Sequence, residues 1–535
     1  MYEIINPILP GFNPDPSIIR VEDDYYIATS TFEWFPGVQI HHSRDLKNWR
    51  LLPHPLTRKS QIDMLGNPDS GGAWAPCLSY HDGTFYLIYT DVKSHKTVFK
   101  DTHNYLVTAT DIMGPWSEPI YLNSSGFDPS LFHDDDGKKW LLNMVWDHRK
   151  GKNSFGGTLI QEYSEEEQKL VGPIRNIFKG TEIGLTEGPH IYKKDGYYYL
   201  LTAEGGTRLK HAATMARSKS LFGPYEVDPT NPILTSYEKP ELVLQKAGHA
   251  SLVETQDGEW YMVHLCGRQL KPSLHCNLGR ETAIQKCEWT EDGWIRLAGG
   301  GNSPKEIVEG PSLPEYPFDD EPTKEEFDSA ELNIHFNSLR VPFEENWVTL
   351  QERPGYLRLY GRESLNSVHR QSLLARRQQG FNVDVETVVE FEPQTFQQMA
   401  GLIYYYNNRN YFYLRVSHDE QLGKCLGIMT SNRGRYDEPL EQEVSIQGLD
   451  RVYLKARIAD ENFQFFYSTD GNEWMKIGPI LNASILSDEN AEVIDDGVFM
   501  EQGFTGAFIG MCVQDLSGQN MHADFDYFSY EENER

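Results

Sequence analysis

Basic residues and cysteines are scarce in this sequence, and long apolar runs are absent. The 535 residues include 49 Lys and Arg against 79 Asp and Glu, so the formal net charge is −30. Such a charge repels phosphate backbones and anionic lipid headgroups, which argues against nucleic acids and membranes as partners. No stretch is apolar for long enough to cross a bilayer, and the first residues lack the basic and apolar regions of a secretory signal. These absences predict a cytoplasmic protein.

The six cysteines show neither a CxxC pair nor the spacing of a metal finger. A chain of this length needs no disulfide framework, so we expect reduced thiols. Motifs of dinucleotide, nucleoside triphosphate and zinc-protease sites are missing as well. We therefore expect no required cofactor.

Aromatic residues and turn formers are abundant, with 11 Trp, 29 Tyr and 26 Phe beside 44 Gly and 29 Pro. This composition suits many short strands joined by tight turns and predicts an all-β fold. A polar turn followed by an aromatic strand occurs five times in the first half. Aligning these repeats places one aromatic residue of each at the same position: Tyr26, Tyr86, Trp140, Tyr199 and Tyr261. Their intervals of 54 to 62 residues accommodate four strands each, which predicts a five-bladed β-propeller.

A second short segment begins 11 or 12 residues before each aligned aromatic. If these segments are the innermost strands of the blades, their first residues form one ring around the central axis. Asp-Pro and Glu-Gly-Pro are also common turn formers, and that alternative applies to each segment alone. Three carboxylates in register favour an active site, because clustered like charges destabilise a fold unless they serve a purpose. The ring consists of Asp15, Ala75 with Trp74 beside it, Asp128, Glu187 and His249.

Three ring carboxylates suit hydrolysis of a glycosidic bond with inversion. In that reaction one carboxylic acid protonates the leaving oxygen, while one carboxylate activates water on the opposite face. Asp15 and Glu187 lie on blades that are not neighbours, which predicts the wide separation, roughly 6.5 to 9.5 Å, that leaves room for water. Asp128, on the blade next to Glu187, is expected to raise the pKa of that acid. The ring thus predicts Asp15 as general base, Glu187 as general acid, and Asp128 as pKa modulator and orienter.

Short motifs throughout the chain carry a family resemblance. They are NPDPS around Asp15, STFEWFPG from Ser30, NPDSGGAWAP from Asn67, SSGFDPSLFHD from Ser124, TEGPH from Thr186, TAEGGT from Thr202, GHASLVE from Gly248, LGRETAIQ from Leu278 and FTGAF from Phe504. Through these motifs the whole chain resembles glycoside hydrolase family 43, and within it the bacterial β-D-xylosidases with a C-terminal domain. The resemblance implies the same three carboxylate roles. It also implies an exo-acting β-1,4-xylosidase on xylooligosaccharides, with α-L-arabinofuranosidase activity beside it.

The resemblance implies substrate contacts as well. They are Arg280, which reaches the sugar hydroxyls and the carboxylates, the apolar walls Phe32, Trp74 and Phe127, a weaker polar contact at Thr207, and Phe504 at the mouth of the pocket. Each aromatic has the alternative of a core residue, and Arg280 that of a structural ion pair. Two alternatives stay open for His249: a core histidine, or a ligand of a divalent cation such as Ca²⁺ on the propeller axis.

The second half begins with a stretch rich in Pro and acidic residues, from about Gly301 to Asn333, which predicts a linker on the surface. Beyond it, apolar and polar residues alternate between turns, which predicts a β-sandwich. The resemblance implies that this sandwich is lectin-like, with a concanavalin-like fold, and that it sends one loop to the propeller. The predicted domains are a propeller over residues 1–315, a linker over 316–333 and a sandwich over 334–535.

Other functions remain in competition. An arabinan-degrading endo-enzyme on the same propeller needs an open cleft, which a loop from the sandwich would block. Fructan-active propellers also use two Asp and a Glu, but their WMNDPNG, RDP and EC signatures are absent. A pair of non-catalytic carbohydrate-binding modules is the alternative outside enzymes. We also expect a homo-oligomer, either a dimer or a tetramer.

Overall fold

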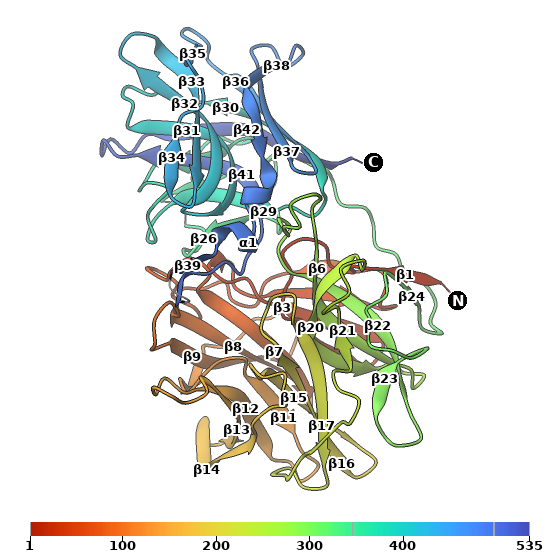
Figure 1. Ribbon diagram of the computed structural model, residues 1–535. Coiled ribbons are helices and arrows are strands. Elements are labelled where there is room, and N and C mark those ends of the chain that lie inside the picture. Colours follow the sequence, from red (N-terminus) through yellow and green to blue (C-terminus); the bar gives the residue numbers. More distant parts are fainter. Residues whose placement is uncertain (1, 345, 496–497, 534–535) are drawn as a thin grey trace.

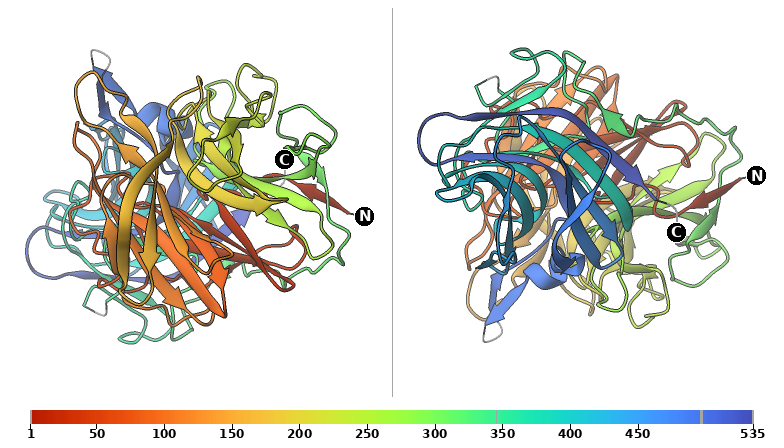
Figure 2. Two further views of the ribbon diagram at one scale, coloured as in Figure 1. Left: turned by 90° about the horizontal axis from the view of Figure 1, so that it is seen from below. Right: turned by 90° about the horizontal axis from the view of Figure 1, so that it is seen from above.

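Two β domains are stacked on each other in the computed structural model, which describes residues 2–344, 346–495 and 498–533 (Figure 1). Seen from below, the propeller lies in front of the sandwich, and from above the order is reversed (Figure 2). Helix is confined, in the described part of the chain, to the short elements η1 (Ala483–Ile485) and α1 (Asp488–Ala491). No described helix is both long and apolar enough to cross a membrane.

Five antiparallel sheets follow one another along the first half of the described chain and form the blades. The first strand of each blade contacts the first strands of its neighbours, so these strands surround the axis. The strands are β2 (Ser17–Val21), β3 (Asp24–Thr29), β5 (Gln39–Ser43) and β6 (Arg50–Leu52) in blade one; β7 (Gly72–His81), β8 (Thr84–Ser94), β9 (Asp101–Ala109) and β10 (Ile120–Asn123) in blade two; β11 (Ser130–His133), β12 (Lys139–Trp146), β13 (Phe155–Ser164) and β14 (Lys169–Phe178) in blade three; β15 (Glu187–Lys194), β16 (Tyr197–Glu204), β17 (Ala212–Ser218), β18 (Glu226–Val227) and β19 (Leu234–Thr235) in blade four; and β20 (Leu244–Glu254), β21 (Trp260–Arg268), β22 (Glu281–Trp289) and β23 (Ile295–Leu297) in blade five.

The predicted five-bladed propeller is therefore confirmed, and the aligned aromatic residues lie in the second strand of each blade. Tight turns join the first and second strands. In blades two and four, Asp82 (φ 46°) and Asp195 (φ 49°) adopt left-handed backbone conformations and each precedes a glycine with positive φ. Two successive residues of this kind match the right-handed twist of a hairpin. In these two blades the Asp-Gly pair thus forms the turn between the first and second strands.

Hydroxyl groups near the axis join neighbouring blades. The Ser17 hydroxyl of blade one accepts a hydrogen bond from the backbone N–H of Leu78 in blade two, at 3.1 Å. The Ser251 hydroxyl of blade five accepts one from the N–H of Ile18 in blade one, at 3.2 Å. Ser130 donates to a carbonyl of blade four at 2.5 Å. Because blade five is bonded back to blade one, the ring is closed and the inner strands are held in register.

The second half forms a sandwich of two large antiparallel sheets over one apolar core. This confirms the predicted sandwich. One sheet contains β27 (Val348–Thr349), β28 (Leu357–Tyr360), β42 (His522–Glu532), β30 (Asn382–Glu390), β36 (Val452–Ala459), β37 (Asn462–Ser468) and β38 (Met475–Asn482), with β25 (Lys324–Glu325) beside β42. The other contains β34 (Arg435–Asp437), β33 (Gly423–Asn432), β32 (Asn410–Asp419), β31 (Gln398–Asn407), β41 (Phe508–Asp515), β29 (Ser372–Arg377), β26 (Asn337–Leu339) and β4 (Trp34–Phe35), with β35 (Val444–Ser445) beside β33.

The two domains share structure at their junction. Strand β4 belongs by sequence to blade one, yet it pairs with β26 and extends a sheet of the sandwich. The indole of Trp34 stacks on the ring of Phe508 with centroids 3.8 Å apart. Within the segment predicted as a linker, β25 already pairs with β42, whereas β24 (Ile307–Glu309) pairs with β1 (Glu3–Ile5) on the propeller. A small hairpin of β39 (Val493–Asp495) and β40 (Val498–Glu501) lies at the same junction (Figure 1).

Candidate active site

A shared backbone conformation marks the ring positions at the axis. The φ angles are 56° at Asp15, 34° at Ala75, 55° at Asp128, 56° at Gly188 and 40° at His249. The inner strands of blades two, four and five also show pairing irregularities at this level. Bulges and left-handed residues of this kind re-aim side chains and occur often beside active sites. The repeat therefore presents five equivalent positions to the axis.

Asp and Gly occupy most of these positions for a steric reason. A left-handed backbone is tolerated by Asp far better than by most residues and costs Gly least. In blade four the glycine takes the left-handed position, and Glu187 immediately before it is the first residue of β15. Glu187 therefore keeps the backbone conformation of a strand, and its longer side chain reaches the ring. All three predicted carboxylates are buried, with 6% of Asp15, 7% of Asp128 and 7% of Glu187 exposed.

Asp15 is held as a carboxylate by three partners. Arg280 Nη1 donates to Asp15 Oδ1 at 2.9 Å, and the Ser30 hydroxyl donates to Oδ2 at 2.7 Å. His249 Nδ1 lies 3.8 Å from Oδ1. Burial alone would raise the pKa of Asp15, but the charge of Arg280, with smaller contributions from His249 and Ser30, outweighs it and lowers the pKa below its usual value. Asp15 is therefore ionised at neutral pH.

Asp128 and Glu187 have the opposite tendency. Asp128 accepts a hydrogen bond from the backbone N–H of Gly188 at 3.0 Å. Burial, aided by the charge of Asp15, still raises the pKa of Asp128 to about 6. Burial and the charges of Asp128 and Asp15 raise the pKa of Glu187 well above its usual value. The site thus combines one stabilised carboxylate with two carboxyl groups that retain protons more readily.

Arg280 also joins the site to the sandwich. Its Nη2 donates to the carbonyl oxygen of Phe504 at 3.0 Å, while the residue is only 2% exposed. The chain segments approach closely here: a Cβ on Gly279 would lie 2.3 Å from the carbonyl oxygen of Thr505, and one on Gly506 would lie 2.6 Å from that of Leu278. Glycine is therefore required on both sides of the contact. The arginine predicted for the site connects the Asp15 carboxylate directly to the loop of the other domain.

The predicted aromatic residues form a continuous wall. Ring centroids are 5.5 Å apart between Phe32 and Trp74, 5.5 Å between Trp74 and Phe127, 5.6 Å between Trp74 and Phe504, and 6.1 Å between Phe32 and Phe504. Phe32 and Phe127 are buried, whereas Trp74 and Phe504 are half-buried. The structure thus brings Phe504 of the sandwich to the propeller residues, and its backbone N–H is bound by the Ser70 hydroxyl at 3.1 Å.

Two predicted residues have a weaker place in this geometry. Thr207 lies half-buried in the bend after β16. His249 lies on the ring beside Asp15, but among the residues that the structure describes no group of three or more His, Cys, Asp or Glu could hold a metal ion. The donor set around His249 therefore does not fit a cation site formed by protein ligands alone.

Sequence reasoning missed the hydroxyls that orient these groups. The Ser30 hydroxyl bridges Asp15 and the backbone N–H of Ala75, which donates to it at 2.7 Å. Ser70 binds Phe504 through its hydroxyl, and its carbonyl accepts a hydrogen bond from the Trp74 indole at 2.9 Å. Both serines lie within the motifs STFEWFPG and NPDSGGAWAP, but a serine in a loop gives no local sign of its partner. Trp146 was also missed, and its ring lies 6.4 Å from that of Phe127.

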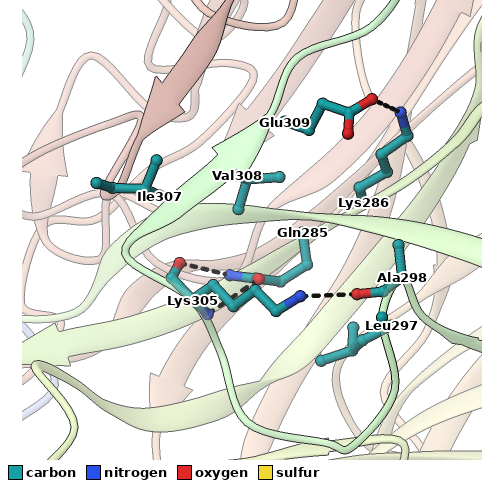
Figure 3. Close-up of a pocket in the computed structure, with 9 residues that line it drawn as sticks. Gln285, Lys286, Leu297, Ala298, Lys305, Ile307, Val308 and Glu309 are labelled. Carbon is teal, nitrogen blue, oxygen red and sulfur yellow. Dashed lines mark hydrogen bonds and ion pairs between the residues drawn. The ribbon is translucent and has the colours of Figure 1, made fainter.

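A separate pocket of about 290 Å³ lies beside β22, β23 and β24 on blade five (Figure 3). Its charged groups are already paired: Lys286 binds Glu309 at 2.7 Å, and Lys305 donates to the Ala298 carbonyl at 2.7 Å. None of the predicted site residues lines it. The carboxylate ring is therefore the better candidate for chemistry.

Comparison with known proteins agrees with this geometry. The family model described as "Glycosyl hydrolases family 43" matches residues 4–295, and "Beta xylosidase C-terminal Concanavalin A-like domain" matches residues 324–531. The chain is 54% identical to a "Beta-xylosidase" of Bacillus subtilis, over 99% of this chain and 100% of that protein. It is 51% identical to "Xylosidase/arabinosidase 43B" of Humicola insolens, over 99% and 98%. The crystal structure of a xylan β-1,4-xylosidase from Bacillus halodurans superposes with a TM-score of 0.96 at 61% identity, over 99% of this chain and 100% of that one.

Proposed function

The chain belongs to family 43 of the glycosyl hydrolases, and from this membership we propose that it is an exo-acting, inverting β-xylosidase. It removes xylose from the non-reducing end of β-1,4-xylooligosaccharides. The names of the relatives from Bacillus subtilis and Bacillus halodurans support this substrate. The name of the Humicola insolens relative supports a second activity on α-L-arabinofuranosides. The observation that carries the proposal is the opposed pKa shifts of Asp15 and Glu187 within one buried ring.

Each carboxyl group has a role that follows from its surroundings. Asp15, ionised by Arg280, accepts a proton from the water that attacks the anomeric carbon. Glu187 retains its proton and donates it to the departing glycosidic oxygen. Burial is the main reason for the high pKa of Glu187, and the charge of Asp128 raises it further. Inversion follows because water and leaving group are on opposite faces of the sugar.

The sandwich loop favours exo over endo action. Phe504 stands against Phe32 and Trp74, and its carbonyl is held by Arg280. A wall contributed by the second domain closes one side of the site. A long internal segment of arabinan or xylan needs an open groove on both sides, so the chain end is the part of a polymer that fits.

The reaction itself tests the function. Incubation of the full chain with xylobiose is expected to release α-xylose first, detected by proton NMR before mutarotation. The reason is that a single displacement by water inverts the β-linkage. Release of β-xylose first would contradict inversion and the role of Asp15 as base. Failure to cleave xylobiose and 4-nitrophenyl β-xyloside would contradict the proposed activity altogether.

Glu187→Ala is expected to lower kcat/KM for xylobiose by about 10²- to 10⁴-fold, because the leaving sugar oxygen then departs without a proton. An aryl xyloside whose phenolate is a stable anion should lose much less. The two substrates, measured by steady-state kinetics on one variant, control for general damage to the site. Equal losses of kcat/KM on the two substrates would show that Glu187 is not the general acid.

Arg280→Met is expected to move the acidic limb of the kcat/KM profile to higher pH. Asp15 works as the carboxylate, so activity is present above its pKa, and loss of the arginine charge raises that pKa. Arg280→Lys keeps a positive charge and should shift the limb less. The alkaline limb reports loss of the Glu187 proton and should move less, also to higher pH, because Arg280 is the smallest of the influences on the pKa of Glu187. An unchanged acidic limb in Arg280→Met would show that Arg280 does not set the ionisation of Asp15.

Phe504→Ala and Phe508→Ala form a matched pair. Phe508 is fully buried, so its truncation should lower the free energy of unfolding by about 3 to 5 kcal/mol. Phe504 is a half-buried wall residue, so its truncation should leave the melting temperature within a few degrees of wild type. Its KM for xylobiose should rise about tenfold. A Phe504 variant that unfolds as readily as the Phe508 variant would make Phe504 a core residue instead.

A further inference from the structure

A buried guanidinium without a partner lies at the junction of the two domains. Arg377 ends β29, in the sandwich sheet that β26 and then β4 of the propeller extend, and only 3% of the residue is exposed. Its Nε and Nη2 atoms have no hydrogen-bond partner in the described structure. The guanidinium carbon lies 5.4 Å from the centre of the Phe508 ring. An aromatic face offers some attraction, but it does not neutralise a buried charge.

Other buried polar side chains on the strands and loops of this junction also lack hydrogen-bond partners in the described structure. His54 follows β6 and is 7% exposed, and its Nε2 has no partner among the described residues. Asn337 pairs with Ala375, two residues before Arg377, so the Asn337 and Arg377 side chains are on one face of the sheet. Both atoms of the fully buried Asn337 amide lack partners in the described chain. The same holds for the amide of Gln39, 1% exposed, whose side chain lies on the same face of β5 as that of His41.

The two domains bring these groups close enough to act on one another electrostatically. The charge of Arg377, after burial itself, is the largest influence that lowers the pKa of His41 and of His54, the latter to about 3. Both imidazoles are therefore neutral at physiological pH, and each can donate one N–H. His41 contacts Asn13 Oδ1 through Nε2 at 3.1 Å, which leaves His54 as the unengaged ring.

No carboxylate of the described chain compensates Arg377. Burial and then the like charge of Arg376 lower its pKa to about 9, and no acidic group opposes them. The acidic groups nearby serve others: Glu321 pairs with His335, and both Glu321 and Glu532 act on Arg376. At neutral pH the Arg377 guanidinium still carries its charge. An isolated buried charge is so unfavourable that proteins nearly always pair it.

We propose that Arg377, His54, Asn337 and Gln39 form a binding site for one small inorganic anion of the halide class between propeller and sandwich. Guanidinium, imidazole and amide N–H groups are all donors that suit chloride or bromide. Of these four residues, His54 lines a groove of about 430 Å³ at the junction. A monovalent ion matches the single uncompensated charge.

This anion would stabilise the contact behind the wall of the carboxylate site. Next to Arg377, the backbone N–H of Gln378 donates to the carbonyl of Ala507 at 2.9 Å. Ala507 is three residues from Phe504, and Phe508 stacks on Trp34 of the propeller. Neutralising Arg377 therefore favours the docked arrangement of the two domains.

Crystals of the full chain grown without chloride and soaked in sodium bromide provide the direct test. An anomalous bromine peak is expected within about 3.5 Å of the Arg377 guanidinium nitrogens. Density of a water molecule without anomalous signal would overturn the proposal. A bromide peak with no effect of halide in solution would mark an adventitious ion only, and would overturn it as well.

Thermal unfolding of the full chain tests binding in solution. At constant ionic strength, replacing sodium gluconate by sodium chloride is expected to raise the melting temperature saturably, by about 2 to 4 °C, because an ion that binds only the folded state stabilises it. Arg377→Met removes the charge at similar volume and should abolish the chloride dependence. A wild-type melting temperature that is equal in gluconate and chloride would refute the site.

Arg376→Met is the matched control. Arg376 is the neighbouring arginine on β29, but it donates to Gln379 Oε1 at 3.1 Å and stacks on Tyr530 at 4.1 Å. Its variant should keep the full response to chloride. If Arg377→Met does not fold, His54→Phe serves as the second variant and should weaken the response. A response that survives in His54→Phe and disappears in Arg376→Met would place the ion elsewhere.

Discussion

The ion pair between Arg280 and Asp15 is the interaction on which the site depends most. Both residues are almost fully buried, and Arg280 spans from the carboxylate of one domain to the Phe504 carbonyl of the other. A buried pair of this kind is costly to form unless every donor and acceptor is used. Here the Ser30 hydroxyl and the Phe504 carbonyl supply two further partners, and Arg280 Nε has none among the described residues. The same contact that ionises the proposed base also locates the second domain.

The pKa values of the three carboxyl groups differ because the groups have different hydrogen-bond and ion-pair partners. Asp15 has a guanidinium and a hydroxyl, Asp128 has one backbone N–H, and the described structure gives Glu187 no side-chain hydrogen bond. Burial is similar for all three, so the partners decide which group holds a proton. This is the arrangement that acid and base catalysis at one pH requires.

The domain junction contains charge pairs as well as apolar contacts. Arg340 of the sandwich binds Asp69 of the propeller at 2.7 Å, and Lys246 of the propeller binds Glu489 of the sandwich at 2.6 Å. Burial, together with the charge of Asp69, raises the pKa of Glu33 beside this contact to about 8. Charge pairs of fixed geometry set how the two domains align, whereas apolar contacts such as that of Trp34 with Phe508 contribute most of the free energy of association between them. Both are needed where a loop of one domain completes a site in the other.

The propeller, the cluster of three carboxylates and the order of the domains can be predicted from the amino-acid sequence alone. These features are periodic or local: Asp-Gly turns recur with aromatic strands, and spacing places Asp15 and Asp128 at one position of the repeat, with Glu187 one residue before the equivalent Gly188. Tertiary structure decided what spacing does not encode. The pairing of β4 with a sheet of the other domain, the hydroxyls of Ser30 and Ser70, and the unpaired Arg377 all depend on residues far apart in the chain. Their partners are chosen by packing between two domains, and packing has no period along a sequence.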